Sequence, residues 1–410
     1  MFDIIETKRI GKRRENLEIR KLTEKEREAN SRLMRYAFQT SKNTYENIES
    51  PIKLPMNWSY GAFDEEKLVA TASYIPYQIR LRSKDFGMSG VAGVASKPEY
   101  RNRGLIRDIM TKMFKHMYDN KIPISVLYPF KLSFYEMLGY KLVDECVDYH
   151  FKISDIIYKE TDYDMIEVDE INDDIMKIYD KVVLNFDYIA KRPLKDYWQR
   201  FYTGNYKFIC YNRDQPVGYI IITFLKVNEH WIEHPERTIF IQEIFWLDQK
   251  AKQTLFNFLW SHRDQREYIL GAFPINENII DLLRTPRIEL RSIRANSLLR
   301  IIDVKAVFEN LEYNLADFSI LFHINDEFCP WNNGIFTLTS KEKNVKVDVN
   351  NTSKESVDIE IDIGHLAQLI AGFRTVGELC ELDFITVNHE KLELLEKLFP
   401  KTNNYLHDIF

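Results

Sequence analysis

The segment from residue 93 to residue 107 has the composition and spacing of an anion-binding loop. It begins with small residues of a β-strand, which Pro98 ends, and apolar residues at helical spacing begin directly after Gly104. A glycine there lets the backbone approach a ligand closely, and the free N–H groups and the dipole of the following helix favour a phosphate. Three arginines can add charge-assisted hydrogen bonds: Arg101, Arg103 and Arg107. The segment therefore predicts a site for a pyrophosphate group.

A group of aromatic residues further along the chain contains a candidate proton donor. The phenol of Tyr135 has an ordinary pKa of about 10, so it is protonated at neutral pH and can donate a proton. Tyr135 also shares an aromatic helix face with Phe130, Phe134 and Tyr140, and such a face usually packs in a core. From the residues alone, core packing is the more common role for this tyrosine.

Two strands and a helix must position these residues. Residues 88–95 are predicted as the central strand, and residues 124–128 are apolar enough to form a neighbouring strand buried on both faces. The helix begins after Gly104. In α/β sheets, ligands bind beyond the ends of such strands, where a gap opens between neighbours. We therefore expect the loop and the strand ends to line one gap.

Two motifs in this region resemble those of the GNAT acyltransferases. Residues 101–106 read Arg-Asn-Arg-Gly-Leu-Ile and are similar to the R-x-x-G-x-[G/A] loop by which GNAT proteins hold the pyrophosphate of acetyl-CoA. Residues 133–140 read Ser-Phe-Tyr-Glu-Met-Leu-Gly-Tyr and resemble the end of the GNAT core. Ile106 departs from the small residue usual in the loop, but Arg-Gly followed by two aliphatic residues and an arginine is typical of the Eis acetyltransferases. The chain therefore resembles an Eis-like GNAT N-acetyltransferase.

The resemblance implies transfer of an acetyl group from acetyl-CoA to a primary amine of a cationic acceptor, such as an aminoglycoside, a lysine or a polyamine, by direct attack and without a metal. In that reading Tyr135 protonates the departing thiolate, and the carboxylate of the last residue, Phe410, is the base. Lys131 could equally be a solvated charge. The implied cofactor-binding residues are Val94, Ala95, Ser96, Arg101, Asn102, Arg103, Gly104, Leu105, Ile106, Arg107, Phe130 and Lys131.

The C-terminus has two readings from the residues alone. Chain ends often fray. The final tripeptide here is apolar and aromatic, broken only by Asp408, and this composition favours burial. The resemblance to Eis-type enzymes, which end on Phe as this chain does, favours the buried reading.

The length of 410 residues predicts several domains. The order of predicted elements repeats after residue 150, so we expect an α/β and α+β fold with tandem GNAT domains. The α+β layout of the last region resembles the sterol-carrier-protein-like domain that ends Eis-type enzymes. The expected domains are residues 1–150, 151–290 and 291–410. In detail, we predict a strand break at Tyr77, a helix over residues 276–283 and an antiparallel sheet in the third domain.

The second copy departs from the first after its central strand. Residues 245–252 contain no glycine and place Asp248 where a pyrophosphate would approach. This copy is therefore expected not to bind CoA and to pack structurally against the first.

Charge and composition exclude several classes of partner. A formal net charge of −6 argues against nucleic acid, which needs a basic face. With no long apolar run and no signal-peptide pattern, we expect a cytoplasmic protein that does not contact a membrane. The four cysteines form no C-x-x-C pair and are expected to be reduced and buried. An acidic run over residues 162–174 could line the approach of a polyamine, although such runs are usually solvated. The resemblance further implies a homo-oligomer, which in Eis-type proteins is a hexamer.

Two other functions stay open. One is a non-catalytic acyl-CoA or lipid-binding protein with a relict acyltransferase domain, which the intact Arg101, Gly104 and Tyr135 disfavour. The other is a tandem-GNAT aminoacyltransferase that uses aminoacyl-tRNA, which an acidic chain with a CoA-type loop disfavours.

Overall fold

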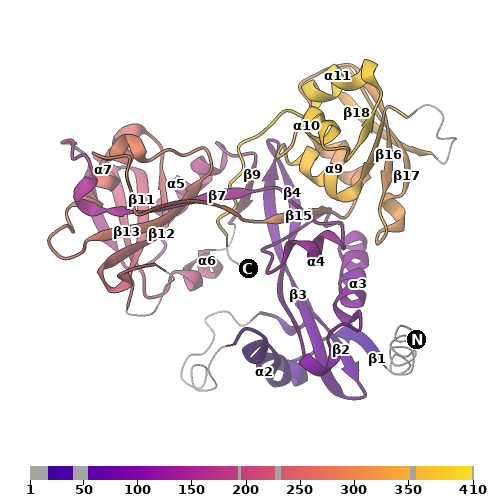
Figure 1. Cartoon of the computed structure of the whole chain (residues 1–410), viewed down its shortest axis with the longest axis horizontal. Coiled ribbons are helices and arrows are strands. Elements are labelled where there is room, and N and C mark those ends of the chain that lie inside the picture. Colours follow the sequence, from indigo (N-terminus) through magenta and orange to yellow (C-terminus); the bar gives the residue numbers. More distant parts are fainter. Residues whose placement is uncertain (1–16, 40–53, 193–194, 227–231, 351–356, 409–410) are drawn as a thin grey trace.

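The protein consists of three lobes, each built on one β-sheet (Figure 1). The computed structural model describes residues 17–39, 54–192, 195–226, 232–350 and 357–408. In these ranges, no helix is both long enough and apolar enough to cross a bilayer. The last described residues, up to Asp408, run between the second lobe and the first, near the centre of the molecule.

The first sheet collects strands from distant parts of the chain. Its order is β1-β2-β3-β4-β5-β15-β6, and β9 pairs with β3. The chain thus leaves this sheet and returns to it twice, which ties the other lobes to it. The strands are β1 (Leu17–Lys21), β2 (Ser59–Asp64), β3 (Lys67–Leu81), β4 (Lys84–Ser96), β5 (Ile124–Leu127), β6 (Lys141–Leu142), β9 (Tyr188–Lys191) and β15 (Leu298–Ile301); the helices are α2 (Arg27–Ala37), α3 (Leu105–Asp119) and α4 (Leu132–Glu136).

The predicted strand break at Tyr77 is wrong, because β3 runs through it without interruption. On one side β3 pairs with β4 as far as its end at Leu81. On the other side β2 pairs only up to Ser73 and β9 begins at Gln78. Pro76 lies between these two neighbours, where its missing N–H breaks no ladder.

The second sheet repeats the core of the first, as predicted. Its order is β14-β7-β13-β12-β11-β10-β8, and β12 and β13 are parallel, as β4 and β5 are. The predicted helix over residues 276–283 is wrong: only Ile280–Leu282 is helical, as a 3₁₀ turn. So short a segment cannot sustain a helix alone, and Ile279 and Leu283 are buried in the core of this lobe instead. The strands are β7 (Glu145–Lys152), β8 (Asp164–Val168), β10 (Tyr206–Asn212), β11 (Gln215–Phe224), β12 (Thr238–Trp246), β13 (Tyr268–Pro274) and β14 (Leu290–Ala295); the helices are α5 (Asp173–Val183), α6 (Lys195–Phe201) and α7 (Gln249–Trp260).

The third sheet is mixed, not antiparallel as predicted. Its order is β18-β17-β16-β19-β20; after the β17–β18 hairpin the chain returns to the other side of β16, where β19 pairs with it in parallel. Asp303 caps α8, accepting from the Ala306 amide at 3.0 Å. The strands are β16 (Phe318–Asn325), β17 (Gly334–Lys341), β18 (Asn344–Asn350), β19 (Ile359–Asp362) and β20 (Thr386–Val387); the helices are α8 (Val304–Asn310), α9 (Ile363–Ile370), α10 (Val376–Glu381) and α11 (Leu392–Leu398).

Both predicted domain boundaries fall inside strands. Residue 150 lies in β7 and residue 290 begins β14, and these two strands pair with each other at one edge of the second sheet. β6, directly before β7, and β15, directly after β14, both belong to the first sheet. The sheets therefore place the domain boundaries between β6 and β7 and between β14 and β15.

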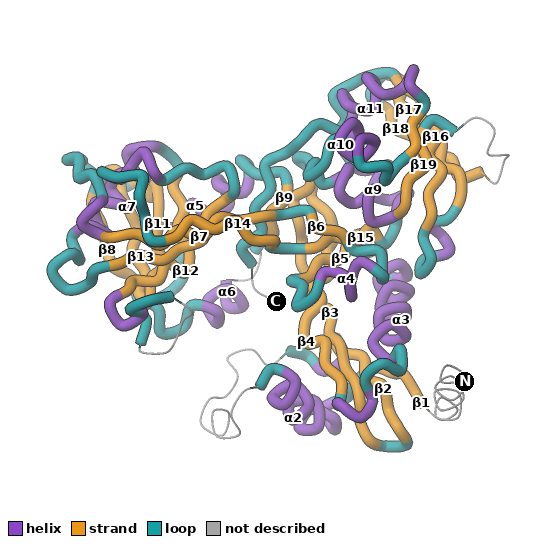
Figure 2. Tube along the Cα trace, viewed as in Figure 1, coloured by secondary structure: helices purple, strands orange, loops and turns teal. Residues whose placement is uncertain are grey.

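The structure also places the acidic run and the cysteines. The acidic run begins next to β8, the strand at the outer edge of the second sheet, away from the first lobe (Figure 2). The four cysteines are free, and all but the half-buried Cys380 are buried. The acidic run thus extends from β8 to the first turn of α5, and a role in the approach of a polyamine stays a prediction.

Candidate active site

A gap opens between the two parallel strands at the centre of the first sheet. β5 pairs with β4 only from Met88 to Gly90. Beyond Gly90, β4 continues for six residues to Ser96 while paired with β3 alone. Its backbone groups on the open side therefore have no partner strand, as expected at a ligand site in a sheet of this kind.

A β-bulge turns the backbone toward this gap. Ser73 of β3 pairs with Ala92 and Thr71 pairs with Ala95, so two residues of β4 oppose one residue of β3. Gly93 is one of the two and has a φ of +59°. This left-handed φ favours glycine, and a Cβ at that position would also lie 2.6 Å from Cε of Met34, whose side chain would have to move. Val94, the other bulge residue, is half-buried, which suits a main-chain contact to a ligand.

The predicted anion loop ends in an open helix N-terminus. Gly104 is the N-cap residue of α3 with a φ of +78°, and no side chain caps the helix. Asn102 also has a left-handed φ of +58°. The first-turn amides of α3, which have no acceptor within the helix, thus remain available to an anion.

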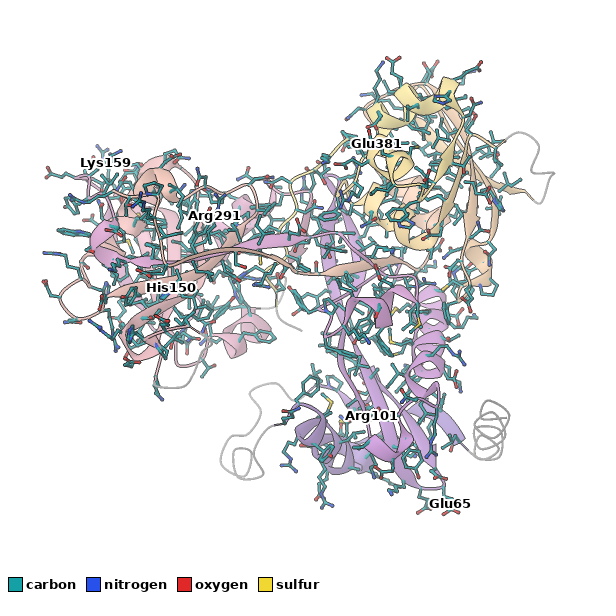
Figure 3. The ribbon with its side chains drawn as sticks, viewed as in Figure 1. Glu65, Arg101, His150, Lys159, Arg291 and Glu381 are labelled. Carbon is teal, nitrogen blue, oxygen red and sulfur yellow. The ribbon has the colours of Figure 1, made fainter. Side chains whose placement is uncertain are left out.

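The three arginines of the loop differ in their surroundings. Arg101 and Arg107 are exposed. Arg103 lies over the ring of Tyr100, 4.6 Å from its centroid, and donates to the Glu99 carbonyl. In Figure 3, Arg101 lies in the first lobe, whereas His150 and Lys159 lie in the second.

Tyr135 is a buried phenol on the short helix α4. It is 3% exposed, and its ring lies edge-on to those of Phe130 and Phe134 at centroid distances of 5.5 and 5.0 Å. No residue that the structure describes forms a hydrogen bond with its hydroxyl. Burial alone raises the pKa of Tyr135 above its ordinary value of 10, so the phenol keeps its proton at neutral pH and can donate it to a ligand.

The turn after α4 fixes Tyr135 relative to β5. The amide of Tyr140 donates to the Tyr135 carbonyl at 3.2 Å and that of Gly139 to Glu136 at 3.0 Å, with Gly139 at a φ of +79°. This is the glycine-terminated C-cap that helices commonly use. The Tyr140 hydroxyl lies 2.6 Å from Oγ of Ser125 on β5.

These elements share one hydrophobic core. Val91 at the start of the gap, Leu105 in the first turn of α3, and Tyr135 all belong to it, and Val94 and Ile106 pack against it. The structure therefore brings the strand end, the loop and the phenol together. Phe130, 71% exposed, and the exposed Lys131 lie just outside, at the start of α4.

The end of the chain reaches the same region. Phe410 lies outside the described residues, but Asp408 lies within them. Its carbonyl accepts from the hydroxyl of Tyr128, the residue after β5, at 2.5 Å. Upstream, the amide of Leu406 donates to the buried carboxylate of Asp144 at 3.1 Å. The buried reading of the C-terminus therefore holds as far as Asp408.

The second copy of the motif is closed by its own side chain. Asp248 caps α7, accepting from the Ala251 amide at 2.7 Å. The first turn of α7 therefore already has a carboxylate where the first turn of α3 has none, and the absence of CoA binding by this copy stays a prediction.

Three residues near the gap were not singled out from the sequence: Tyr128, Arg192 and Glu243. Glu243 is the one charged residue in the largely apolar strand β12, and that charge is the one local signal. Arg192 and Tyr128 contact Asp408, more than two hundred positions away, so no local pattern could reveal them.

We expect Gly104→Val to raise the KM for acetyl-CoA about tenfold or more. A side chain at a φ of +78° costs roughly 1–2 kcal/mol and also blocks the approach of a phosphate to the first turn of α3. Initial rates against acetyl-CoA concentration would measure it. Gly204→Val is the matched control, since Gly204 has a φ of +80° with open space around it. A KM that rises equally in both variants would contradict a ligand role for Gly104.

Family models match most of the chain. Two models described as an acetyltransferase (GNAT) domain match residues 18–143 and 190–301, and a sterol carrier protein domain model matches residues 304–407. The predicted fold class is thereby confirmed.

Known proteins share this architecture over nearly the whole chain. An uncharacterized N-acetyltransferase from Streptomyces avermitilis is 24% identical over 345 residues, which cover 77% of this chain and 79% of the relative. A probable N-acyltransferase of unknown function from Enterococcus faecalis superposes with a TM-score of 0.85 at 23% identity, covering 96% of this chain and all of the other. Eis1 from Mycobacterium abscessus superposes with a TM-score of 0.75 at 17% identity, with the same coverage.

Proposed function

We propose that this chain, a tandem GNAT protein with the Eis-like domain order, transfers an acetyl group from acetyl-CoA to a primary amine of a cationic acceptor. The observation that carries the proposal is the grouping, in one core, of an open helix N-terminus, a bulged strand end and a buried, protonated phenol. GNAT domains in general use acetyl-CoA.

The cofactor would lie in the gap between β4 and β5. The amides of the loop and of the first turn of α3 would hold its pyrophosphate, aided by Arg101 and Arg107. The bulge at Val94 would present a backbone N–H to the thioester oxygen. The remaining predicted contacts, at Phe130 and Lys131, would meet the outer part of the cofactor.

The reaction would proceed by direct attack. The amine nitrogen forms a bond to the thioester carbon, and charge that develops on the oxygen is stabilised by the backbone at Val94. The tetrahedral intermediate collapses with cleavage of the carbon–sulfur bond. Tyr135 gives its proton to the leaving sulfur, and the proton lost from nitrogen passes to a base.

We propose the carboxylate of Phe410 as that base. Its support is the resemblance to Eis-type enzymes together with the course of the tail, which brings Asp408 to Tyr128 at the end of β5. We also propose that the protein is cytoplasmic and, by its resemblance to Eis-type proteins, that it forms a homo-oligomer, namely a hexamer.

Adding one residue after Phe410 is expected to lower kcat about 10²-fold, because each extended residue moves the terminal carboxylate by roughly 3.5 Å. An extra residue placed before Met1 serves as the control. Steady-state rates with a reactive amine measure the effect. Unchanged turnover in the extended protein would remove the terminal carboxylate from the mechanism.

The central experiment is release of free thiol from acetyl-CoA against a panel of amines, with an aminoglycoside, a polyamine and a lysine peptide as acceptors. Amine-dependent release is the expected result, and the preferred acceptor identifies the substrate class. Tight binding of acetyl-CoA without release for any amine would favour a non-catalytic carrier. Transfer only from aminoacyl-tRNA would favour an aminoacyltransferase.

A further inference from the structure

A buried arginine joins the two GNAT lobes to the end of the chain. Arg192 follows β9 of the first sheet, and its two terminal nitrogens donate to both carboxylate oxygens of Glu243 on β12, at 3.0 and 2.8 Å. Its Nε donates to Oδ1 of Asp408 at 2.7 Å. The three side chains are 4%, 0% and 6% exposed, respectively. One guanidinium is thus shared by two buried carboxylates from different parts of the chain.

Aromatic residues hold this cluster in place. The Arg192 guanidinium lies over the rings of Tyr179 and Trp198, at 4.0 and 4.4 Å from their centroids. The Tyr179 hydroxyl also lies 3.2 Å from Oδ2 of Asp408, although its shorter hydrogen bond, at 2.8 Å, goes to the Ala190 carbonyl. Glu243 has two further donors of its own, the hydroxyls of Tyr202 at 3.0 Å and Tyr219 at 2.6 Å. The planar fork of the arginine therefore has a single orientation.

A bridge between the lobes does not by itself require Asp408. Arg192 and Glu243 already form a neutral pair from one lobe to the other. Adding Asp408 puts a second carboxylate beside one guanidinium, and burial of an extra charge costs free energy. The cost indicates that holding Asp408 serves the tail rather than the bridge.

The backbone of Asp408 is held as well as its side chain. Its carbonyl accepts from Tyr128, at the end of β5, at 2.5 Å. The preceding residue, His407, lies with Nε2 2.6 Å from the carbonyl of Gln242 on β12. Two residues can span about 7 Å at most, so the position of Asp408 limits where the chain can end.

We infer that Arg192 is a positioning residue that holds Asp408, and with it the tail of the chain, beside Tyr128 at the end of β5, next to the gap between β4 and β5. The inference rests on the proposed function, in which the terminal carboxylate is the base. Arg192 itself touches no substrate in this role.

Asp408→Ala is the first test, because it removes the contact between Arg192 and Asp408, here called the latch, while leaving the Arg192–Glu243 pair intact. We expect kcat to fall tenfold or more, while the Kd for acetyl-CoA, measured by calorimetry, changes less than twofold. Asp408→Asn, which keeps an acceptor for Nε of Arg192, should recover part of kcat. Adding a residue after Phe410 should cost far less in Asp408→Ala than in the native chain, because both changes displace the same carboxylate.

A second readout does not depend on catalysis. A serine carboxypeptidase should release Phe410 from Asp408→Ala at least tenfold faster than from the native protein. The matched control is Glu277→Gln, which removes one partner of the Lys252–Glu277 ion pair in the second lobe, and it should change neither kcat nor the release rate.

Each outcome decides the question. Equal release rates from Asp408→Ala and the native chain would overturn the latch. Faster release with unchanged kcat would overturn its role in positioning the base. Faster release from a protein that acetylates no amine would uphold the latch and reject the proposed function.

Discussion

Replacing Tyr135 with phenylalanine is expected to lower kcat about 10²-fold or more while leaving the fold intact. The ring of Tyr135 packs edge-on against Phe130, Phe134 and Tyr140, and a phenylalanine ring keeps those contacts. Its hydroxyl has no hydrogen-bond partner among the described residues, so its removal leaves no buried group unpaired. The lost function is therefore the proton for the leaving thiolate, and the KM for acetyl-CoA should change little.

Tyr313→Phe is the matched control for this variant. Tyr313 is a buried tyrosine of the third lobe whose hydroxyl donates to the Phe308 carbonyl at 3.0 Å. Its loss should cost about 1 kcal/mol of stability without changing kcat. Equal kcat in Tyr135→Phe and the native protein would exclude Tyr135 as the acid.

The pH dependence offers a second check on Tyr135. Burial raises the pKa of Tyr135 above 10, and an acid is active while it is protonated, so its activity should persist below pH 10 and be lost only above it. The kcat of the native protein should consequently show no falling limb between pH 7 and pH 9. A falling limb there that is absent in Tyr135→Phe would contradict this assignment.

The local parts of the site could be predicted from the sequence because their backbone geometry depends on residues that are close together in the chain. Gly104 marks an open helix start and Gly139 a helix end, and both have the left-handed φ that such positions need. The bulge at Gly93 depends on β3 as well, since it arises from how Ala72 of β3 is opposed. Its occurrence could be expected only through the family resemblance.

Which sheet β9 and β15 join could not be predicted from neighbouring residues. The sequence of residues 296–303 is typical of a strand, but nothing in it indicates that β15 inserts between β5 and β6 of the first sheet. β9 is four residues long and pairs with a strand more than a hundred positions earlier. Such pairings depend on long-range packing, which periodicity does not report.

The contacts of the last described residues are also long-range and could not be predicted from local patterns. Asp408 was noted as a polar interruption of an apolar end, which favoured burial. Its partners Arg192 and Tyr128 follow two different strands of the first sheet, β9 and β5, and only folding brings them to Asp408. The residues that do chemistry could thus be proposed from motifs, whereas those that position them required the structure.

A second buried arginine connects the candidate acid to the third lobe. Arg300 on β15 is fully buried and donates through Nη2 to both carboxylate oxygens of Asp326, at 2.7 and 2.9 Å. Its guanidinium carbon lies 4.5 Å from the ring centroid of Phe114 on α3. It also packs so closely on Gly139, in the turn after Tyr135, that a Cβ there would overlap it. Its other nitrogens, Nε and Nη1, find no acceptor among the described residues, so Asp326 is its main source of compensation.

Asp326→Ala should therefore lower the free energy of unfolding by about 3–5 kcal/mol, because it leaves the charge of Arg300 buried without a partner. Asp326 further accepts from the amides of Phe328 and Cys329, which adds to the loss. Urea denaturation followed by circular dichroism would measure the change. The exposed Glu393→Ala, which breaks an i,i+4 pair with Lys397, should stay within about 0.5 kcal/mol of the native protein. The double variant Asp326→Ala with Arg300→Met should be more stable than Asp326→Ala alone, because removing the charge removes the penalty. A double variant less stable than Asp326→Ala would show that Arg300 acts through its packing on Phe114 and Gly139 instead.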